Sequence, residues 1–306
     1  MTKYILRRLL SFIPVFFIIV TLVFFLIRLA PGGPFQGGER YVPPEVLEQL
    51  RETYNLNAPI YVQYFDYLAD LAQGDLGPSM YQPSRSVTEW IALRLPVSLE
   101  LGAYALLVAI SLGMLAGVVA ALKPNSATDY MPMSFAMVGI CVPNFVLGPV
   151  LVLVFSLKLG WFPVSGWTWP MEKVLPSVTL GAAYAAYVAR LARGGMFEVL
   201  AQDFIRTARA KGLPEVRVVL RHALRGGVQP VLAFLGPATA GLLTGSFVVE
   251  QIFQVPGLGK QFVDAAFNRD YTMLMGAVLV YAAMILVFNL IVDVIQALLD
   301  PRVRYG

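Results

Sequence analysis

The stretch that decides the fold is DFIRTARAKGLPEVRVVLRHALR, residues 203–225. It is the longest markedly basic segment of a chain that is otherwise mostly apolar. Gly212 and Pro214 divide it into two short pieces, and proline is tolerated where a helix starts, so a second helix is predicted to begin there. Its basic residues are Arg206, Arg209, Lys211, Arg217, Arg221 and Arg225, accompanied only by Asp203 and Glu215.

Both pieces of this segment are amphipathic when placed on a helix, because side chains three or four residues apart share one face. The predicted apolar face of the first piece consists of Ala201, Phe204, Ile205 and Ala208. The second piece carries a basic stripe of Arg217, Arg221 and Arg225 opposite an apolar face of Val216, Val219, Leu220 and Ala223. A basic helix–turn–helix of this kind predicts a contact surface for another protein.

The composition places this segment in a membrane protein. Of the 306 residues, 58% are hydrophobic and 14% charged, and the mean hydropathy is +0.68, whereas a soluble domain carries about 25% charged residues. A pI of about 9.1 fits basic loops beside membrane spans, since nucleic-acid binding needs a soluble basic face. The single cysteine, Cys141, excludes a disulfide within the chain, and its apolar surroundings predict a buried, unreactive thiol.

Six apolar runs are long enough, or nearly so, to cross about 30 Å of hydrocarbon, which takes roughly 20 residues. The fourth is the weakest, because Pro176 interrupts it and Arg190 and Arg193 close it. The start, MTKYILRRLL, has the charge of a signal peptide, but the long apolar run after it lacks an A-x-A site, which favours an uncleaved first span. The predicted spans lie near 9–29, 97–122, 131–157, 174–193, 228–249 and 273–299.

Lysine and arginine placement sets the orientation of such a protein, because basic residues collect in cytoplasmic loops. With the N-terminus inside, 14 of the 23 basic residues fall on the cytoplasmic side. The prediction is therefore an all-α membrane protein with six transmembrane helices and both termini in the cytoplasm. Its predicted parts are 1–29 (N-terminus and first span), 30–96 (an outer loop region), 97–299 (a five-span core with the cytoplasmic loop 194–227 and the outer loop 250–272) and 300–306 (a cytoplasmic tail).

The two outer regions carry turn signals and short amphipathic stretches. Residues 30–96 contain APGGP, the short helix predicted for PPEVLEQLRETYNL, the Tyr-rich YVQYFDYL and the turn GDLGPS. At about 65 residues this region is too small for an independent enzyme domain, so a lid or docking surface is expected. The candidate residues for outer docking or gating are Gly74, Asp75, Gly77, Pro256, Gly257, Gly259, Arg269 and Asp270.

The usual catalytic constellations are missing from the sequence. One histidine and one cysteine provide neither a metal cluster nor a Cys–His pair. GLGK at 257–260 is not a phosphate loop, because Gln254 and Gln261 stand where a glycine and a Ser or Thr are required. The chain is therefore not expected to be an enzyme or to bind ATP, a metal or another cofactor by itself.

A few ionisable residues lie in or near the spans, where charged groups are often functional. For Asp293 in the last span, with Asn289 one turn earlier, a structural role is favoured over proton coupling. Glu250 and Arg28 stand at outer ends of spans, where they are expected to reach water. His222 is expected to be an ordinary residue of the basic loop and not a proton relay.

Residues 203–225 resemble the cytoplasmic EAA loop of ABC-importer permease subunits, in the form found in peptide permeases. Anchored on Gly212, only Ala208, Gly212 and Leu224 agree with the general E-A-A-x3-G-x9-I-x-L-P pattern, whereas DFIRTARAKGL followed by RHALR is close to the peptide-permease version. The motifs LAPGGP, LNAPIYVQYFDYL, GDLGPS, RLPVSLEL and VEQIFQVPGLGKQFVDAAFNRDY extend the resemblance over the whole chain. The chain is similar to B-type permeases of bacterial oligopeptide and dipeptide importers.

This resemblance implies a type I ABC-importer permease fold in the bacterial inner membrane, with a cytoplasmic coupling helix seated on an ATPase and anchored by Phe204, Ile205 and Ala208. It also implies the partners: a second, C-type permease that completes the peptide path, two ATP-binding cassette subunits that hold ATP-Mg, and a periplasmic or lipid-anchored binding protein. The residues implied in coupling are Asp203, Phe204, Arg206, Thr207, Ala208, Arg209, Lys211, Gly212 and Leu213. The basic second helix contributes Arg217, Arg221, His222 and Arg225. The basic residues beside the three apolar anchors, Arg206 and Arg209 among them, are expected to pair with acidic residues of the ATPase.

Several alternatives remain open from the sequence. Close relatives of the peptide permeases carry nickel complexes or glutathione, and the sequence does not separate these substrates. A stand-alone ion-coupled carrier would need several buried ionisable residues, and Asp293 alone is thin support. An intramembrane enzyme should show two aspartates in its spans, a Ser–His pair or H-E-x-x-H, and the sequence has none of these.

Overall fold

The computed structural model describes residues 2–29, 33–34, 43–244 and 247–299. These residues are almost entirely helices and turns, with no strand among them beyond one isolated bridge between Pro78 and Ser86. The side chain of Asp293 lies outside the described part of the chain, so its predicted role is not addressed. The chain divides into two compact units, Met1–Val97 with Pro256–Leu286 and Ser98–Val255 with Val287–Gly306.

The first unit joins the N-terminal helices to the outer segments around them. Its core has two clusters: Phe24, Tyr64 and Met275 form one, and Val87, Ile91, Leu258, Ala265, Met273 and Ala277 form the other. Its helices are α1 (Thr2–Leu29), α2 (Pro44–Thr53), α3 (Ile60–Ala72), the start of α4 (Val87–Leu122), α13 (Leu258–Phe267) and the first part of α14 (Tyr271–Leu299).

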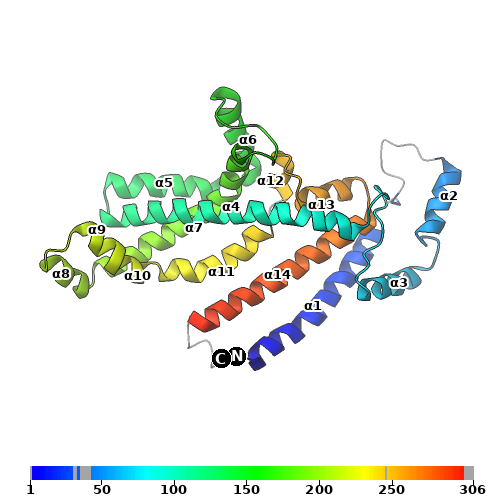
Figure 1. Ribbon diagram of the computed structural model, residues 1–306, viewed down its shortest axis with the longest axis horizontal. Coiled ribbons are helices and arrows are strands. Elements are labelled where there is room, and N and C mark those ends of the chain that lie inside the picture. The colour runs from blue at the N-terminus through cyan, green and yellow to red at the C-terminus, as the bar shows by residue number, and fades with distance from the viewer. Residues whose placement is uncertain (1, 30–32, 35–42, 245–246, 300–306) are drawn as a thin grey trace. The chain divides into compact units, whose positions relative to one another are not determined.

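The second unit is organised around the long helix α7 (Pro170–Leu200), which packs against α5, α6, α10, α11 and α12 (Figure 1). Helix α4 also lies directly against α7, since a side chain at Gly117 would clash with the Ala189 carbonyl. Small residues allow this close approach, as expected for helices in a membrane. The other elements are α5 (Ala127–Cys141), α6 (Asn144–Leu151), η1 (Val152–Lys158), α8 (Asp203–Ala210), α9 (Glu215–Arg217), η2 (Val218–Ala223), α10 (Leu224–Gly227), α11 (Gln229–Leu243) and α12 (Phe247–Ile252).

Among the described residues, four helices are long and apolar enough to cross a membrane, and up to six if each of two bent pairs is one span. The four are Leu10–Leu29, Val87–Leu122, Pro170–Leu200 and Tyr271–Val292. The bent pairs are Ala127–Cys141 with Asn144–Lys158, at 115°, and Glu215–Gly227 with Gln229–Leu243, at 57°. The predicted span 131–157 therefore contains a bend, whereas the 57° bend lies at the start of the predicted span 228–249.

Two prolines in the predicted spans have different effects: Pro143 follows the end of a helix, whereas Pro176 lies within one. Val142, the residue before Pro143, is extended (φ −88, ψ 116), because a following proline disfavours the helical conformation, and the helix ends there. The fourth span was expected to be weak, yet α7 runs for 31 residues through a buried Pro176. Proline lacks the N–H that would bond the carbonyl one turn earlier, and in a helix bundle neighbouring groups can satisfy that carbonyl.

Residues 87–96 of the predicted outer region form the first part of α4, whose start carries a reciprocal cap: Glu89 N donates to Ser86 Oγ, and Ser86 N donates to Glu89 Oε2, each at 3.2 Å. Two further expectations are corrected. Cys141 was expected to be buried and is exposed at the bend after α5. Glu250 was expected to reach water but is fully buried, where Ser98 Oγ donates to its Oε1 at 2.8 Å.

An ion pair that no sequence motif predicted connects α5 to α7. Arg193 donates from Nε to Oδ1 of Asp129 at 2.5 Å and from Nη2 to Oδ2 at 2.6 Å. Asp129 is only 1% exposed, and its Oδ2 also accepts from Asn125 N at 3.0 Å. This two-point geometry fixes the first turn of α5 against α7, since parallel Arg–carboxylate bonds restrict orientation as well as distance.

We predict that Asp129→Ala destabilises the protein. Removing one partner of a buried pair leaves the other charge uncompensated, at a cost of about 3–5 kcal/mol; since Arg193 is 34% exposed, a loss of about 2 kcal/mol is expected in the free energy of unfolding. The measurement is thermal unfolding of the purified protein in detergent. Asp203→Ala, which breaks the exposed pair with Arg206, is the control and should leave the melting temperature unchanged. Equal melting temperatures for the two variants would contradict the role given to Asp129.

Candidate functional site

The basic segment 203–225 forms the predicted helix–turn–helix. Helix α8 ends at Ala210, and Gly212 turns the chain with φ +75, a left-handed conformation that side chains other than glycine disfavour. Gly212 N donates to Arg209 O at 2.9 Å, which closes the turn. Pro214 then caps α9, so the second helix begins one residue later than expected.

One face of this segment is buried inside the protein's own second unit. Ile205 and Ala208 of α8 pack with Val218, Val219 and Ala223 of η2. This cluster rests on Ala121 at the end of α4 and on Met196 of α7. The predicted use of Ile205 and Ala208 as anchors on a partner protein is therefore wrong, because their side chains are already covered within the chain.

The exposed face differs from the predicted one for a backbone reason. Of the predicted apolar face of the second helix, Val219 and Ala223 are buried as expected, but Val216 and Leu220 are 70% and 61% exposed. Val218, which was not assigned to this face, is buried. Residues 218–223 form a π-helix, whose hydrogen bonds span five residues, so the face that an α-helical spacing predicts is shifted. On α8, Phe204 is 47% exposed and is the large apolar side chain that this helix presents outward.

Charge pairing fixes the turn between the two helices. Arg209 donates from Nη2 to Glu215 Oε1 at 2.5 Å and from Nε to Oε2 at 3.1 Å. This hydrogen bonding raises the pKa of the Arg209 guanidinium, so the pair stays ionised. The role expected for Arg209, pairing with acidic residues of another protein, is thus already filled within the chain.

The remaining predicted coupling residues lie around this turn. Arg206 pairs with Asp203 at 3.3 Å, where both side chains are highly exposed, and Thr207 Oγ1 donates to Asp203 O at 3.0 Å. Leu213 packs against the buried cluster, and His222 is half-buried. The other exposed basic residues of the segment are Lys211, Arg217, Arg221 and Arg225.

The predicted outer residues gather in the first unit, where Asp270 is the centre of their hydrogen bonds. Its carboxylate accepts from Ser79 Oγ, from Met80 N at 3.1 Å, from Tyr81 N at 3.3 Å and from Met273 N at 3.0 Å. Thr272 Oγ1 lies 3.0 Å from Asp270 Oδ1 and donates to Pro78 O at 2.7 Å. Asp270 is 2% exposed, so it joins the segment 78–81 to the start of α14 and is not itself a docking group.

The other predicted outer residues divide between the surface and the core. Gly257 and Gly259 are buried, whereas Gly74 and Asp75 are exposed. Gly77 N donates to Asp75 Oδ1 at 2.8 Å within the turn. Pro256 and Arg269 are half-buried.

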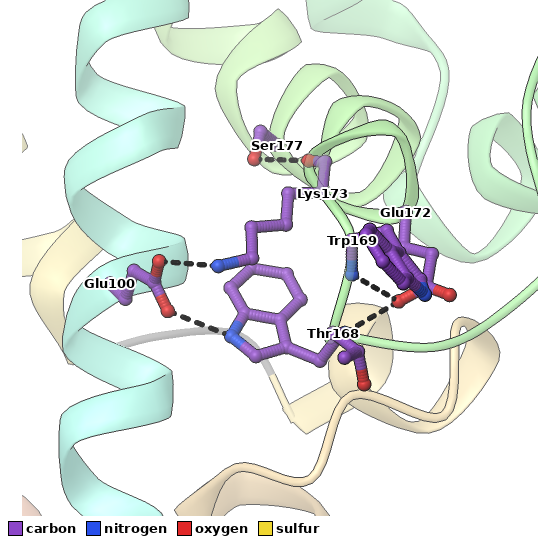
Figure 2. A network of polar contacts seen from close by, with 7 residues as sticks. Glu100, Thr168, Trp169, Glu172, Lys173 and Ser177 are labelled. Carbon is purple, nitrogen blue, oxygen red and sulfur yellow. Dashed lines mark hydrogen bonds and ion pairs between the residues drawn. The ribbon is translucent and has the colours of Figure 1, made fainter.

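A group in the second unit was missed by the sequence analysis (Figure 2). Glu100 of α4 accepts from Lys173 Nζ at 2.6 Å and from Trp167 Nε1 at 2.9 Å. Glu172 accepts from Trp169 N at 3.0 Å and so caps the start of α7. These contacts attach the loop before α7 to α4, and no local motif in the sequence joins residues this far apart.

Within the described residues, no group of three or more His, Cys, Asp and Glu side chains could hold a metal ion. The fold defines a multi-pass helical membrane protein with an exposed basic segment. Residues 113–305 match the family described as binding-protein-dependent transport system inner membrane component, and residues 1–102 match the N-terminal region of such membrane components. The chain belongs to this family.

Relatives and one solved structure agree with that assignment. The chain is 48% identical to the oligopeptide transport system permease protein OppB of Haemophilus influenzae and 50% identical to OppB of Salmonella typhimurium, over 100% of each chain. It is 41% identical to the dipeptide transport system permease protein DppB of Bacillus subtilis, over 99% of this chain and 98% of the relative. A crystal structure of an amino acid ABC transporter with histidines shares the fold, with a TM-score of 0.52 and 18% identity over 69% of this chain and 94% of that one. The resemblance to ABC-importer permeases is confirmed.

Replacing Gly212 should loosen the turn without disturbing the spans. A Cβ at Gly212 meets no atom within 4 Å, so the cost of Gly212→Val comes from the backbone conformation, about 1–2 kcal/mol. We expect faster tryptic cleavage after Lys211 in the folded protein, and a smaller effect for Gly212→Asn, since asparagine tolerates this conformation. The matched control is Gly194→Ala in α7, where the Cβ also meets open space but the backbone is helical. Unchanged cleavage in Gly212→Val would contradict the strain argument.

Removing the Asp270 carboxylate should release the segment 78–81. Hydrogen bonds to a charged group contribute about 1.5–3 kcal/mol each, so Asp270→Ala is expected to speed amide hydrogen exchange of Met80 and Tyr81 by about tenfold or more. Asp264→Ala is the control, because Asp264 makes only a 3.4 Å pair with Lys260 on α13. Protection of Met80 and Tyr81 that survives in Asp270→Ala would show that other contacts hold this segment.

Proposed function

We propose that this chain is the transmembrane permease subunit of an ATP-driven peptide importer in the bacterial inner membrane. The observation that carries the proposal is the 48–50% identity with oligopeptide permeases over the entire length of both chains. Identity that includes the spans, the basic segment and the outer loops argues for the same kind of assembly. Six spans with both termini in the cytoplasm are part of the proposal. Four of them are the straight apolar helices, and each of the two bent helix pairs would form one more.

The proposed assembly contains a second, C-type permease that completes the peptide path, two ATP-binding cassette subunits and a periplasmic or lipid-anchored binding protein. ATP-Mg belongs to the cassette subunits, and this chain acts as a permease and not as the enzyme. Nickel complexes and glutathione are the alternative substrates, and none of the contacts described favours them. A stand-alone ion-coupled carrier is disfavoured because the family is a component of binding-protein-dependent transport systems.

The basic segment offers a mechanism for coupling to ATP hydrolysis. Helix α8 presents Phe204 and the exposed Arg206 and Lys211 outward, while Ile205 and Ala208 fasten it to α4 and α7. A cassette subunit that binds the outward face would pull on the buried face when it closes on ATP. Because packed cores are close to incompressible, the displacement passes to the two spans and favours alternating access by rigid-body motion.

The outer segments are proposed to receive the binding protein. The turn at Gly74–Gly77, Pro256 and Arg269 lie in one unit. In the same unit Asp270 joins the segment 78–81 to the start of α14. Gly257, Gly259 and Asp270 support this surface from within, because their own atoms are buried.

The direct test of the proposed function is peptide uptake by proteoliposomes that contain the permease pair, the cassette subunits and the binding protein. Uptake should require ATP and the binding protein, and oligopeptides should compete with it while nickel complexes and glutathione do not. Uptake by this chain alone without ATP would contradict the proposal.

Phe204→Ala is predicted to weaken the assembly of the cassette subunit. A buried aromatic anchor at an interface contributes about 2 kcal/mol or more, so affinity should fall at least tenfold, measured by co-purification and by the rate of ATP hydrolysis. Phe267→Ala on α13 is the control, since that side chain is equally large and 78% exposed but belongs to the proposed outer side. If both variants assemble like the unmodified protein, Phe204 is not the anchor.

A further inference from the structure

A surface pocket in the first unit carries two guanidinium groups and an indole. Its volume is 790 Å³, and it lies between the segment 82–85, the first turns of α4 and Pro256. Arg85 and Arg94 are the charged residues that line it, beside the apolar side chains of Pro83, Leu93 and Val97. The pocket therefore combines positive charge with an apolar wall.

Both guanidinium groups of this pocket lie close to the Trp90 ring. The guanidinium carbons of Arg85 and Arg94 lie 5.3 Å and 5.2 Å from the ring centroid of Trp90, within the range of cation–π attraction. Arg94 Nη1 donates to Pro256 O at 3.2 Å, which ties α4 to the turn before α13. The arrangement is thus prepared before any ligand arrives.

One nitrogen atom of Trp90 and one of Arg94 have no acceptor among the described residues. Trp90 Nε1 and Arg94 Nε are buried and lack a hydrogen-bond partner anywhere in the part of the chain that the structure describes. A buried donor without a partner costs about 1–3 kcal/mol, and more when the group is charged. Side chains with unpartnered buried donors are candidates for binding a ligand whose oxygen atoms accept these hydrogen bonds.

The neighbouring carboxylates among the described residues already have partners, although Asp264 and Asp270 line a second cavity together with Trp90 and Arg94. Glu89 accepts from Ser86 N at the start of α4, Asp264 pairs with Lys260, and Asp270 holds the segment 78–81. A planar guanidinium matches a carboxylate better than any other common protein group. The acceptor that fits the pocket is therefore a carboxylate from outside this chain.

We infer that the pocket lined by Arg85, Trp90 and Arg94 receives an acidic side chain of the binding protein, next to an apolar side chain that covers Leu93 and Val97. This inference rests on the proposed function, which places the first unit's outer segments opposite the binding protein. Pro256, a predicted docking residue, forms part of the same pocket. Exposed Arg85 would attract the acidic group at a distance, and Arg94 would hold it once docked.

The experiment measures the affinity of the purified binding protein for the complete transporter in lipid nanodiscs. Arg94→Gln and Arg85→Gln should each weaken binding about tenfold and reduce its dependence on salt, because a charge pair is lost. Trp90→Phe keeps the ring but removes the N–H and should weaken binding by a smaller factor. Lys158→Gln, an exposed basic residue of the second unit, is the matched charge control and should bind like the unmodified protein. Melting temperatures and basal ATP hydrolysis of all variants establish that the assemblies are intact.

A charge exchange identifies the acidic partner. Arg94→Glu should abolish tight docking, and one substitution of an exposed Asp or Glu to Arg on the binding protein should restore it. Unchanged affinity for the binding protein in both arginine variants would overturn the inference. It would also be overturned if the arginine variants took up peptides with a free C-terminus more weakly but amidated peptides normally, because the pocket would then bind the peptide carboxylate. The proposed function fails separately, if the unmodified assembly takes up no peptide with ATP.

Discussion

The arrangement depends first on the burial of one small apolar cluster, in which Ile205 and Ala208 of α8 meet Val218, Val219 and Ala223 on top of Ala121 and Met196. Helix α8 has eight residues, too few to be stable alone, so its position is set by this packing. The same contacts connect it to the ends of α4 and α7. A segment fixed in this way can pass a displacement to the spans, whereas a loosely attached loop would absorb it.

Charge pairing completes what apolar packing begins. Arg209 and Glu215 close the turn at Gly212, Arg193 and Asp129 fix α5 to α7, and Glu100 with Lys173 attaches the start of α7 to α4. In the first unit Asp270 has the same role through hydrogen bonds to backbone amides. Many residues that the sequence marks as candidate contacts thus serve inside the chain, and the exposed remainder is the surface left for partners.

The helical membrane architecture was predictable because apolar run length acts over whole segments. The turn at Gly212 was predictable from a single residue, since a left-handed backbone selects glycine. The face of the second helix was predicted only in part, because a π-helix at 218–223 changes the spacing on which the prediction depended. The early start of α4 had a local signal, the Ser86–Glu89 cap, whereas the Asp129–Arg193 pair joins residues with no motif between them.

The coupling proposed for this protein requires that the basic segment moves as one body with α7. Spin labels at Lys211 and at Arg190, both exposed and both in the second unit, would report their separation by electron paramagnetic resonance in the complete transporter. The account predicts the same narrow distance distribution with the cassette subunits open, closed on ATP and after hydrolysis. A distribution that shifts or broadens between these states would show that the segment slides on the spans and would contradict it.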